Sequence, residues 1–157
     1  MNPESNPVGT DTSDSKILLF KIEQGIFCID LGVVNRVIYM TETQPVPGMP
    51  PYFIGLLNLH NEKIPVIDLS IKLQIRDESQ YTVNTPIILC QNETCQVGFI
   101  VDETIDVENF TMPELKAQNL FKGDAAAYLQ GSIHTDHGEV LLFSPQKIFE
   151  EKIIKVD

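Results

Sequence analysis

The feature that most constrains the fold is a motif that occurs twice, Tyr-x-x-Gly followed by two apolar runs with a polar turn between them. The first copy begins at Tyr52 and Gly55, and the second begins at Tyr128 and Gly131, 76 residues further along the chain. Short apolar runs separated by polar turn residues are typical of β-hairpins. A chance match of short apolar strands is the alternative, and the shared tyrosine and glycine count against it. The motif therefore predicts two similar β units.

A second part of the repeat precedes each copy of the motif. The apolar runs of residues 17–31 resemble those of residues 87–102, at an offset of about 70 residues. About five strands per unit, interrupted by glycine and proline, cannot bury their inner faces in an open sheet of this size. We predict a mainly β protein with two similar five-stranded SH3-like β-barrel subdomains that share an apolar interface, with short helices and a C-terminal helix starting at Ser144-Pro145.

The polar segments suggest where the units begin and end. Residues 1–15 hold almost nothing that could be buried, so we expect a disordered tail. A polar connector at 76–85 divides the domain at 16–152 into subdomain one, about 16–80, and subdomain two, about 81–152. The pattern leaves open an exchange of the first strands between the two subdomains. A short helix is predicted to start at Thr111, and residues 153–157 form a C-terminal tail.

Charge and hydropathy narrow the class of partner. Eleven basic and 22 acidic residues give a net charge of −11, which disfavours nucleic acid and direct binding to anionic membranes and favours protein partners. No apolar run approaches the roughly 18 residues of a membrane span, and the polar N-terminus is unlike a signal peptide. We therefore expect a cytoplasmic location, where the three cysteines stay reduced.

Residues able to support catalysis or bind metal are few. The chain has three histidines, of which His134 and His137 form a His-x-x-His pair across a predicted hairpin turn with no fourth ligand nearby in sequence. Asp30, Asp68 and Asp102 each end an apolar strand, where a carboxylate usually caps backbone amides. We expect no enzyme activity, no cofactor and no metal site; a small β-barrel metal protein or enzyme that uses His134 and His137 is the alternative from another class.

Seven sequence segments together carry a resemblance to a known family. They are Phe27-Cys-Ile-Asp-Leu31, Val34-Asn-Arg-Val37, Pro45-Val-Pro47, Tyr52-Phe-Ile-Gly55-Leu-Leu-Asn58-Leu59, Ile64-Pro65-Val-Ile-Asp68-Leu69, Val97-Gly98-Phe-Ile-Val101-Asp102 with Val107, and Tyr128-Leu-Gln-Gly131. With these segments the chain resembles the CheW-type coupling proteins of bacterial chemosensory arrays over about residues 16–149. The resemblance implies two five-stranded barrels and no catalysis. It also implies a role in linking the regulatory domain of a CheA-type histidine kinase to the cytoplasmic tip of a methyl-accepting chemoreceptor, within membrane-associated receptor arrays.

By the same resemblance, a receptor groove lies between the subdomains. Mapped onto this chain, the groove would involve Val34, Arg36, Val37, Leu59, His60, Val101 and Thr104.

Two departures from the family pattern fall in this groove. Many family members carry glutamate where this chain has Arg36, and Arg-Gly where it has His60-Asn61. If the two positions are adjacent as the resemblance implies, a Glu–Arg attraction is replaced by Arg36 beside the imidazole of His60, which is neutral at best and repulsive when His60 is charged, unless Glu62 supplies the acid. If the turn needs a positive φ, Asn61 is the least costly substitute for glycine. These changes leave open a diverged adaptor of a pilus-motility or other non-flagellar chemosensory system.

Overall fold

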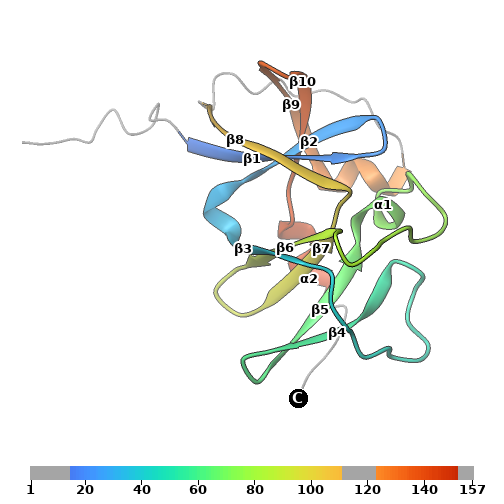
Figure 1. The fold of residues 1–157 in the computed structure, drawn as a ribbon. Helices are drawn as coiled ribbons and strands as arrows, with labels where there is room; N and C mark the ends of the chain where they lie inside the picture. The colour runs from blue at the N-terminus through green and yellow to red at the C-terminus, as the bar shows by residue number, and fades with distance from the viewer. Residues whose placement is uncertain (1–14, 111–122, 152–157) are drawn as a thin grey trace, which may run out of the picture.

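The computed structural model describes residues 15–110 and 123–151 (Figure 1). Of the expected tails, residues 1–14 and 152–157 lie outside the described residues, as does the helix predicted to start at Thr111. Neither α-helix in the described part of the chain is long and apolar enough to cross a bilayer.

The described residues contain ten strands and four short helices, so the prediction of a mainly β fold is confirmed. The strands are β1 (Ser15–Ile22), β2 (Gly25–Asp30), β3 (Val34–Tyr39), β4 (Phe53–Leu59), β5 (Glu62–Asp68), β6 (Pro86–Gln91), β7 (Gln96–Ile100), β8 (Glu103–Phe110), β9 (Leu129–Thr135) and β10 (Gly138–Phe143). The helices are α1 (Leu69–Lys72), α2 (Gln146–Glu151) and the 3-10 segments Leu31–Val33 and Gly123–Tyr128.

The strands form two five-stranded sheets, each an SH3-like barrel, as predicted. We call the sheet ordered β8-β1-β2-β10-β9 the outer barrel and the sheet ordered β3-β6-β7-β5-β4 the central barrel (Figure 1). Each barrel takes strands from both sides of residue 80. The first two strands of each repeat lie in the barrel formed by the rest of the other repeat, because β1 and β2 join β8–β10 while β6 and β7 join β3–β5.

The exchanged strands are buried on both faces. In β1, Ile17 and Leu19 point into the outer barrel, whereas Leu18 and Phe20 belong to the core between the barrels. The corresponding strand β6 alternates in the same way, with Ile87 pointing into the central barrel. Because successive side chains of a strand point to opposite faces, a strand that lies between two cores must be apolar throughout.

The core between the barrels, here called the interface core, confirms the predicted shared apolar interface. Its aromatic centre is a T-shaped contact between Phe99 of β7 and Phe143 of β10, with ring centroids 5.2 Å apart. Each of these two residues is 1% exposed, and they come from different barrels. Edge-to-face pairs of this kind are favourable beyond the area that they bury.

The two tyrosines of the repeated motif meet at a single lysine. The Nζ atom of Lys72 lies 4.0 Å from the ring centroid of Tyr52 and 5.1 Å from that of Tyr128. Lys72 also forms an ion pair of 3.1 Å with Glu151 of α2. The glycine of the first copy is needed for a different reason. A Cβ atom on Gly55 would lie 2.8 Å from the carbonyl oxygen of Gln44, so a larger side chain does not fit there.

The shared core predicts that the two barrels unfold together. We expect Phe99→Ala to lower the free energy of unfolding by about 3–5 kcal/mol, because it leaves a cavity in the interface core. Chemical denaturation followed by circular dichroism measures this and should show one transition. Val83→Ala is the control, since Val83 is 77% exposed and should change stability by less than about 0.5 kcal/mol. Two separate transitions would contradict the shared core.

Candidate partner-binding groove

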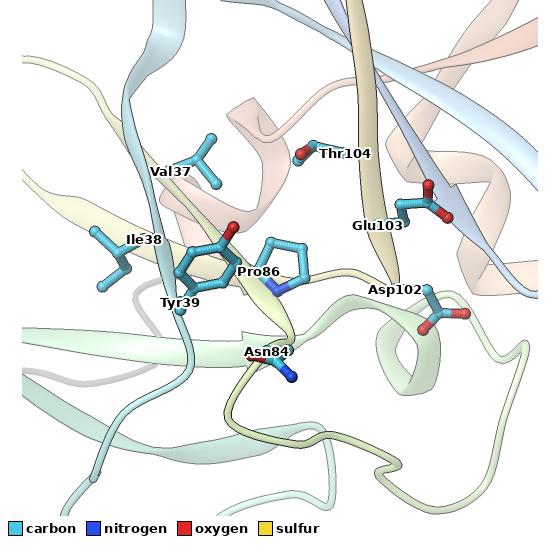
Figure 2. A pocket seen from close by; sticks show the side chains of 8 residues that line it. All are labelled: Val37, Ile38, Tyr39, Asn84, Pro86, Asp102, Glu103 and Thr104. Carbon is cyan, nitrogen blue, oxygen red and sulfur yellow. The ribbon is translucent and has the colours of Figure 1, made fainter.

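A hollow of about 420 Å³ lies between β3, an edge strand of the central barrel, and β8, an edge strand of the outer barrel. We call it the β3–β8 groove (Figure 2). Its lining residues are Val37, Ile38, Tyr39, Asn84, Pro86, Asp102, Glu103 and Thr104.

Strand alternation decides which side chains face this groove. Val37 and Tyr39 pair with Ile88 and Pro86 of β6, whereas Ile38 between them packs against the core of the central barrel. Figure 2 shows Val37 and Tyr39 on the side of β3 toward β8, and Ile38 on the other side. Val37 is 41% exposed and Tyr39 is 69% exposed, so the groove presents apolar surface to solvent.

An ionic cluster at one end of the groove joins three distant segments. The guanidinium of Arg76, in the connector, forms a two-pronged contact with the carboxylate of Asp102, with 2.8 Å between Nη1 and Oδ1. It also contacts Glu23, in the β1–β2 turn. The hydrogen bonds to Asp102 raise the pKa of Arg76, and the hydrogen bond to Glu23 raises it further. Together they outweigh burial, which lowers this pKa. Since Asp102 is already paired, Glu103 is the exposed acid that the groove offers to a partner.

The three strand-ending aspartates do not all act as local caps. Asp30 accepts a hydrogen bond from the amide of Gly32, and Asp68 accepts one from the amide of Ser70, as predicted. Asp102 instead accepts a bond of 2.8 Å from the amide of Glu23, 79 residues away.

The seven residues predicted for the receptor groove fall into three environments. Val37 and Thr104 line the β3–β8 groove together. Val34 and Val101 contact the interface core, where Val101 is only 1% exposed. The remaining three lie elsewhere on the central barrel: Arg36 is exposed on β3, Leu59 packs partly buried at the end of β4, and His60 is exposed in the turn that follows. A role for the seven in partner binding stays a prediction.

Glu62 has a different partner from the one that the sequence suggested. Its Oε2 atom accepts a hydrogen bond of 2.6 Å from Gln96 of β7. No ion pair joins Glu62 to Arg36 within the part of the chain that the structure describes. The acid that the sequence left open as a replacement partner for Arg36 is therefore engaged with the neighbouring strand.

Tyr39 is one of the groove residues that were not predicted from the sequence. It ends the apolar run of β3, and a run of this kind by itself suggests burial. The available signal was its spacing of two from Val37, which puts both side chains on one face of the strand. Asn84, Pro86 and Glu103 were also missed, and they reach the groove only through the pairing of their strands.

The β4–β5 turn has the positive φ angles that glycine adopts most easily. Leu59 pairs with Glu62, which leaves a two-residue loop, and both loop residues have positive φ: 51° at His60 and 65° at Asn61. Two positive φ values define a type I′ turn, and asparagine tolerates this region better than other non-glycine residues. The turn is therefore kept while its side chains differ from the Arg-Gly pattern.

The remaining reactive side chains do not gather around the groove. Burial raises the pKa of Cys90 to about 12, and burial together with the charge of Glu108 does the same for Cys28. His134 and His137 pair with different carboxylates, His134 with Glu139 at 3.6 Å and His137 with Glu108 at 3.4 Å. The two histidines are thus not brought together as one ligand pair.

Two interleaved SH3-like barrels with an open, partly apolar groove between their edge strands define a β-rich binding module. A family model described as the CheW-like domain matches residues 16–152. The chain therefore belongs to the CheW-like domain family.

Individual relatives agree with this assignment. The chain is 27% identical to the chemotaxis protein CheW of Thermotoga maritima over 140 residues, which cover 89% of this chain and 91% of that protein. It is 34% identical to the chemotaxis protein CheW of Bacillus subtilis over 92 residues, covering 59% of this chain and 58% of that protein. The fold is similar to that in the crystal structure of the scaffolding protein TtCheW from Thermoanaerobacter tengcongensis, with a TM-score of 0.76, 22% identity, and coverage of 84% and 90% of the two chains.

The type I′ turn generates a prediction about stability. Asn61→Ala should lower the free energy of unfolding by about 1 kcal/mol, because alanine has the same Cβ crowding at this φ but lacks the short polar side chain whose local hydrogen bonds help asparagine to adopt it. Asn61→Gly should cost nothing, since glycine has no Cβ. Thermal or chemical denaturation measures both. Asn58→Ala is the matched control, because Asn58 is exposed on β4 outside the turn. Equal effects of alanine at both positions would contradict the assigned turn.

Proposed function

We propose that this protein is a non-catalytic adaptor that couples chemoreceptors to a CheA-type histidine kinase in bacterial chemosensory signalling. The observation that carries the proposal is the match to the CheW-like domain across residues 16–152. The protein works in the cytoplasm and is recruited to membrane-associated receptor arrays, and its partners are the regulatory domain of the kinase and the cytoplasmic tip of a methyl-accepting chemoreceptor. The matched relatives are named chemotaxis proteins, which favours this role over a pilus-motility system.

The β3–β8 groove supports the proposal for the receptor. Its exposed Val37 and Tyr39 give an apolar contact surface, and aromatic side chains are frequent among the residues that dominate binding energy at protein interfaces. Thr104 on the opposite strand contributes a polar group at the rim. An apolar centre with a polar rim is the usual anatomy of a protein-binding surface.

The two departures from the family pattern lie outside the β3–β8 groove, on the central barrel. Arg36 is exposed on β3 next to Val37, and strand alternation turns its side chain away from the groove. Ile38 and Leu59 both pack against the core of the central barrel, which ties β3 and the β4–β5 hairpin to one body. A partner that binds the groove and also covers β3 and the β4–β5 turn would contact Arg36 and His60.

The proposal is tested by binding to two purified partners, the regulatory domain of a CheA-type kinase and a receptor-tip fragment. We expect both to bind at about tens of micromolar or tighter. Val37→Glu should weaken receptor binding about tenfold or more, because it places a charge in an apolar contact. Kinase binding should be unchanged, which shows that the fold is intact.

Gln130→Glu is the matched control for the added charge, since Gln130 is exposed on β9, the outer-barrel edge strand opposite β8. It should leave both affinities unchanged. The adaptor role would be refuted if the unmodified protein failed to bind one or both of the two partners. Equal loss of receptor binding in both variants would refute the groove as its site.

A second prediction concerns the two departures from the family pattern. The double variant Arg36→Glu with His60→Arg restores the family's acid–base pair, and we expect it to bind a receptor tip from a typical family system more tightly than the unmodified protein does. Titration calorimetry measures the affinity, and the two single variants serve as controls because each lacks one member of the pair. If the double change leaves receptor affinity untouched, these positions do not select the partner.

A further inference from the structure

We infer that Asp106, Glu108 and His137 bind a divalent transition-metal ion, with zinc as the expected occupant, at the place where the outer barrel closes. A ligand atom from each of the three side chains lies within 4.8 Å of the other two. The set combines one imidazole and two carboxylates from segments that are about 30 residues apart in sequence. This site is separate from the β3–β8 groove, and it does not depend on the adaptor role.

The topology explains why these residues meet. Asp106 and Glu108 are two apart on β8, so both side chains lie on one face of the strand. They pair with Leu19 and Ile17, whose side chains fill the outer barrel. β8 is one end of the five-stranded order and β9 is the other. His137 lies in the turn between β9 and β10, so an ion held by the three would bridge the two ends of the sheet.

The distances fit a shared ion. The Nε2 atom of His137 lies 3.4 Å from the Oε2 atom of Glu108. This separation is longer than the roughly 2.9 Å of an ordinary N–H···O hydrogen bond. Two ligand atoms that are each about 2.0–2.1 Å from a tetrahedral zinc ion lie about 3.3–3.4 Å apart. The pair is therefore already spaced as one edge of a zinc tetrahedron, and the ligand atom of Asp106, within 4.8 Å of both, supplies the third ligand.

Neighbouring hydrogen bonds fix the positions of two of the three proposed metal ligands, and the site remains open to solvent. The amide of His137 donates a hydrogen bond of 3.0 Å to Oγ1 of Thr135, which fixes the turn. Oδ1 of Asp106 accepts a bond from the amide of Val107 and leaves the other oxygen available. The side chains of His137 and Glu108 are 34% and 19% exposed, and Asp106 is exposed, so all three ligands are reachable by solvent. Water can then occupy the fourth position of the ion.

The donor set selects the kind of metal. An imidazole nitrogen suits zinc and similar transition metals, whereas magnesium and calcium prefer oxygen ligands alone. Two carboxylates and a net charge of −11 favour a cation electrostatically. His134 lacks this environment, because it is 76% exposed and the ion-pair partner found for it among the described residues is Glu139. It provides an internal control of the same residue type in the same hairpin.

The test is titration of zinc chloride into the full chain after treatment with a chelator, followed by calorimetry and by thermal unfolding. We expect one zinc ion per chain with a Kd in the micromolar range or tighter, and a higher Tm in zinc. His137→Gln and Glu108→Gln should each weaken binding about tenfold or more. His134→Gln should bind as the unmodified protein does. Circular dichroism checks that each variant is folded, and Glu108→Gln keeps the side-chain size.

Three results would overturn the inference. They are no zinc binding up to about 100 µM, an equal loss in His134→Gln, and full competition by a similar concentration of magnesium, which would show non-specific attraction to acidic groups. Binding that is lost in both His137→Gln and Glu108→Gln but kept in His134→Gln would establish the site. The adaptor role is measured separately by partner binding, so either proposal can fail without the other.

Discussion

The structure depends on the apolar core between its two barrels. Because β1 and β2 are built into the outer barrel while the rest of their repeat forms the central barrel, neither barrel is a continuous product of one repeat. The exchanged strands bury one face inside a barrel and the other against its neighbour, and the contact between Phe99 and Phe143 lies where the two barrels meet. Burial on both faces makes the pair of barrels one packed unit, which fixes the positions of the edge strands β3 and β8.

That arrangement produces the groove and its charge pattern. The two edge strands lie apart at the surface, so the side chains that would otherwise enter the interface core, such as Val37 and Tyr39, stay exposed. At one end, Arg76 ties the connector to the β1–β2 turn and to Asp102. A paired carboxylate there offers less attraction to a partner than a free one. The groove thus joins an apolar surface to an acidic end, because Arg76 offsets only part of the charge of Glu23, Asp102 and Glu103, while Arg36 carries a positive charge on β3 outside the groove.

The parts of the site that could be predicted are those governed by local spacing. Positive φ at Asn61 and the caps at Asp30 and Asp68 follow from a few neighbouring residues, and the structure has all three. The contacts of Glu62 with Gln96 and of Asp102 with Glu23 join segments 34 and 79 residues apart, and no local pattern indicates them. His137 shows the same limit, since its nearest carboxylate is Glu108 on another strand rather than a residue of its own turn.

The sequence by itself determined the β class, the two repeated units, the apolar interface and the resemblance to CheW-type proteins, because alternation, turn residues and the Tyr-x-x-Gly motif act over short distances. Only the tertiary structure decided which strands share a barrel, which predicted groove residues reach the surface, and which carboxylates meet His137. The physical reason is that strand pairing joins residues far apart in the chain. One apolar strand can satisfy its hydrogen bonds with either neighbour, and the choice depends on how the whole core packs.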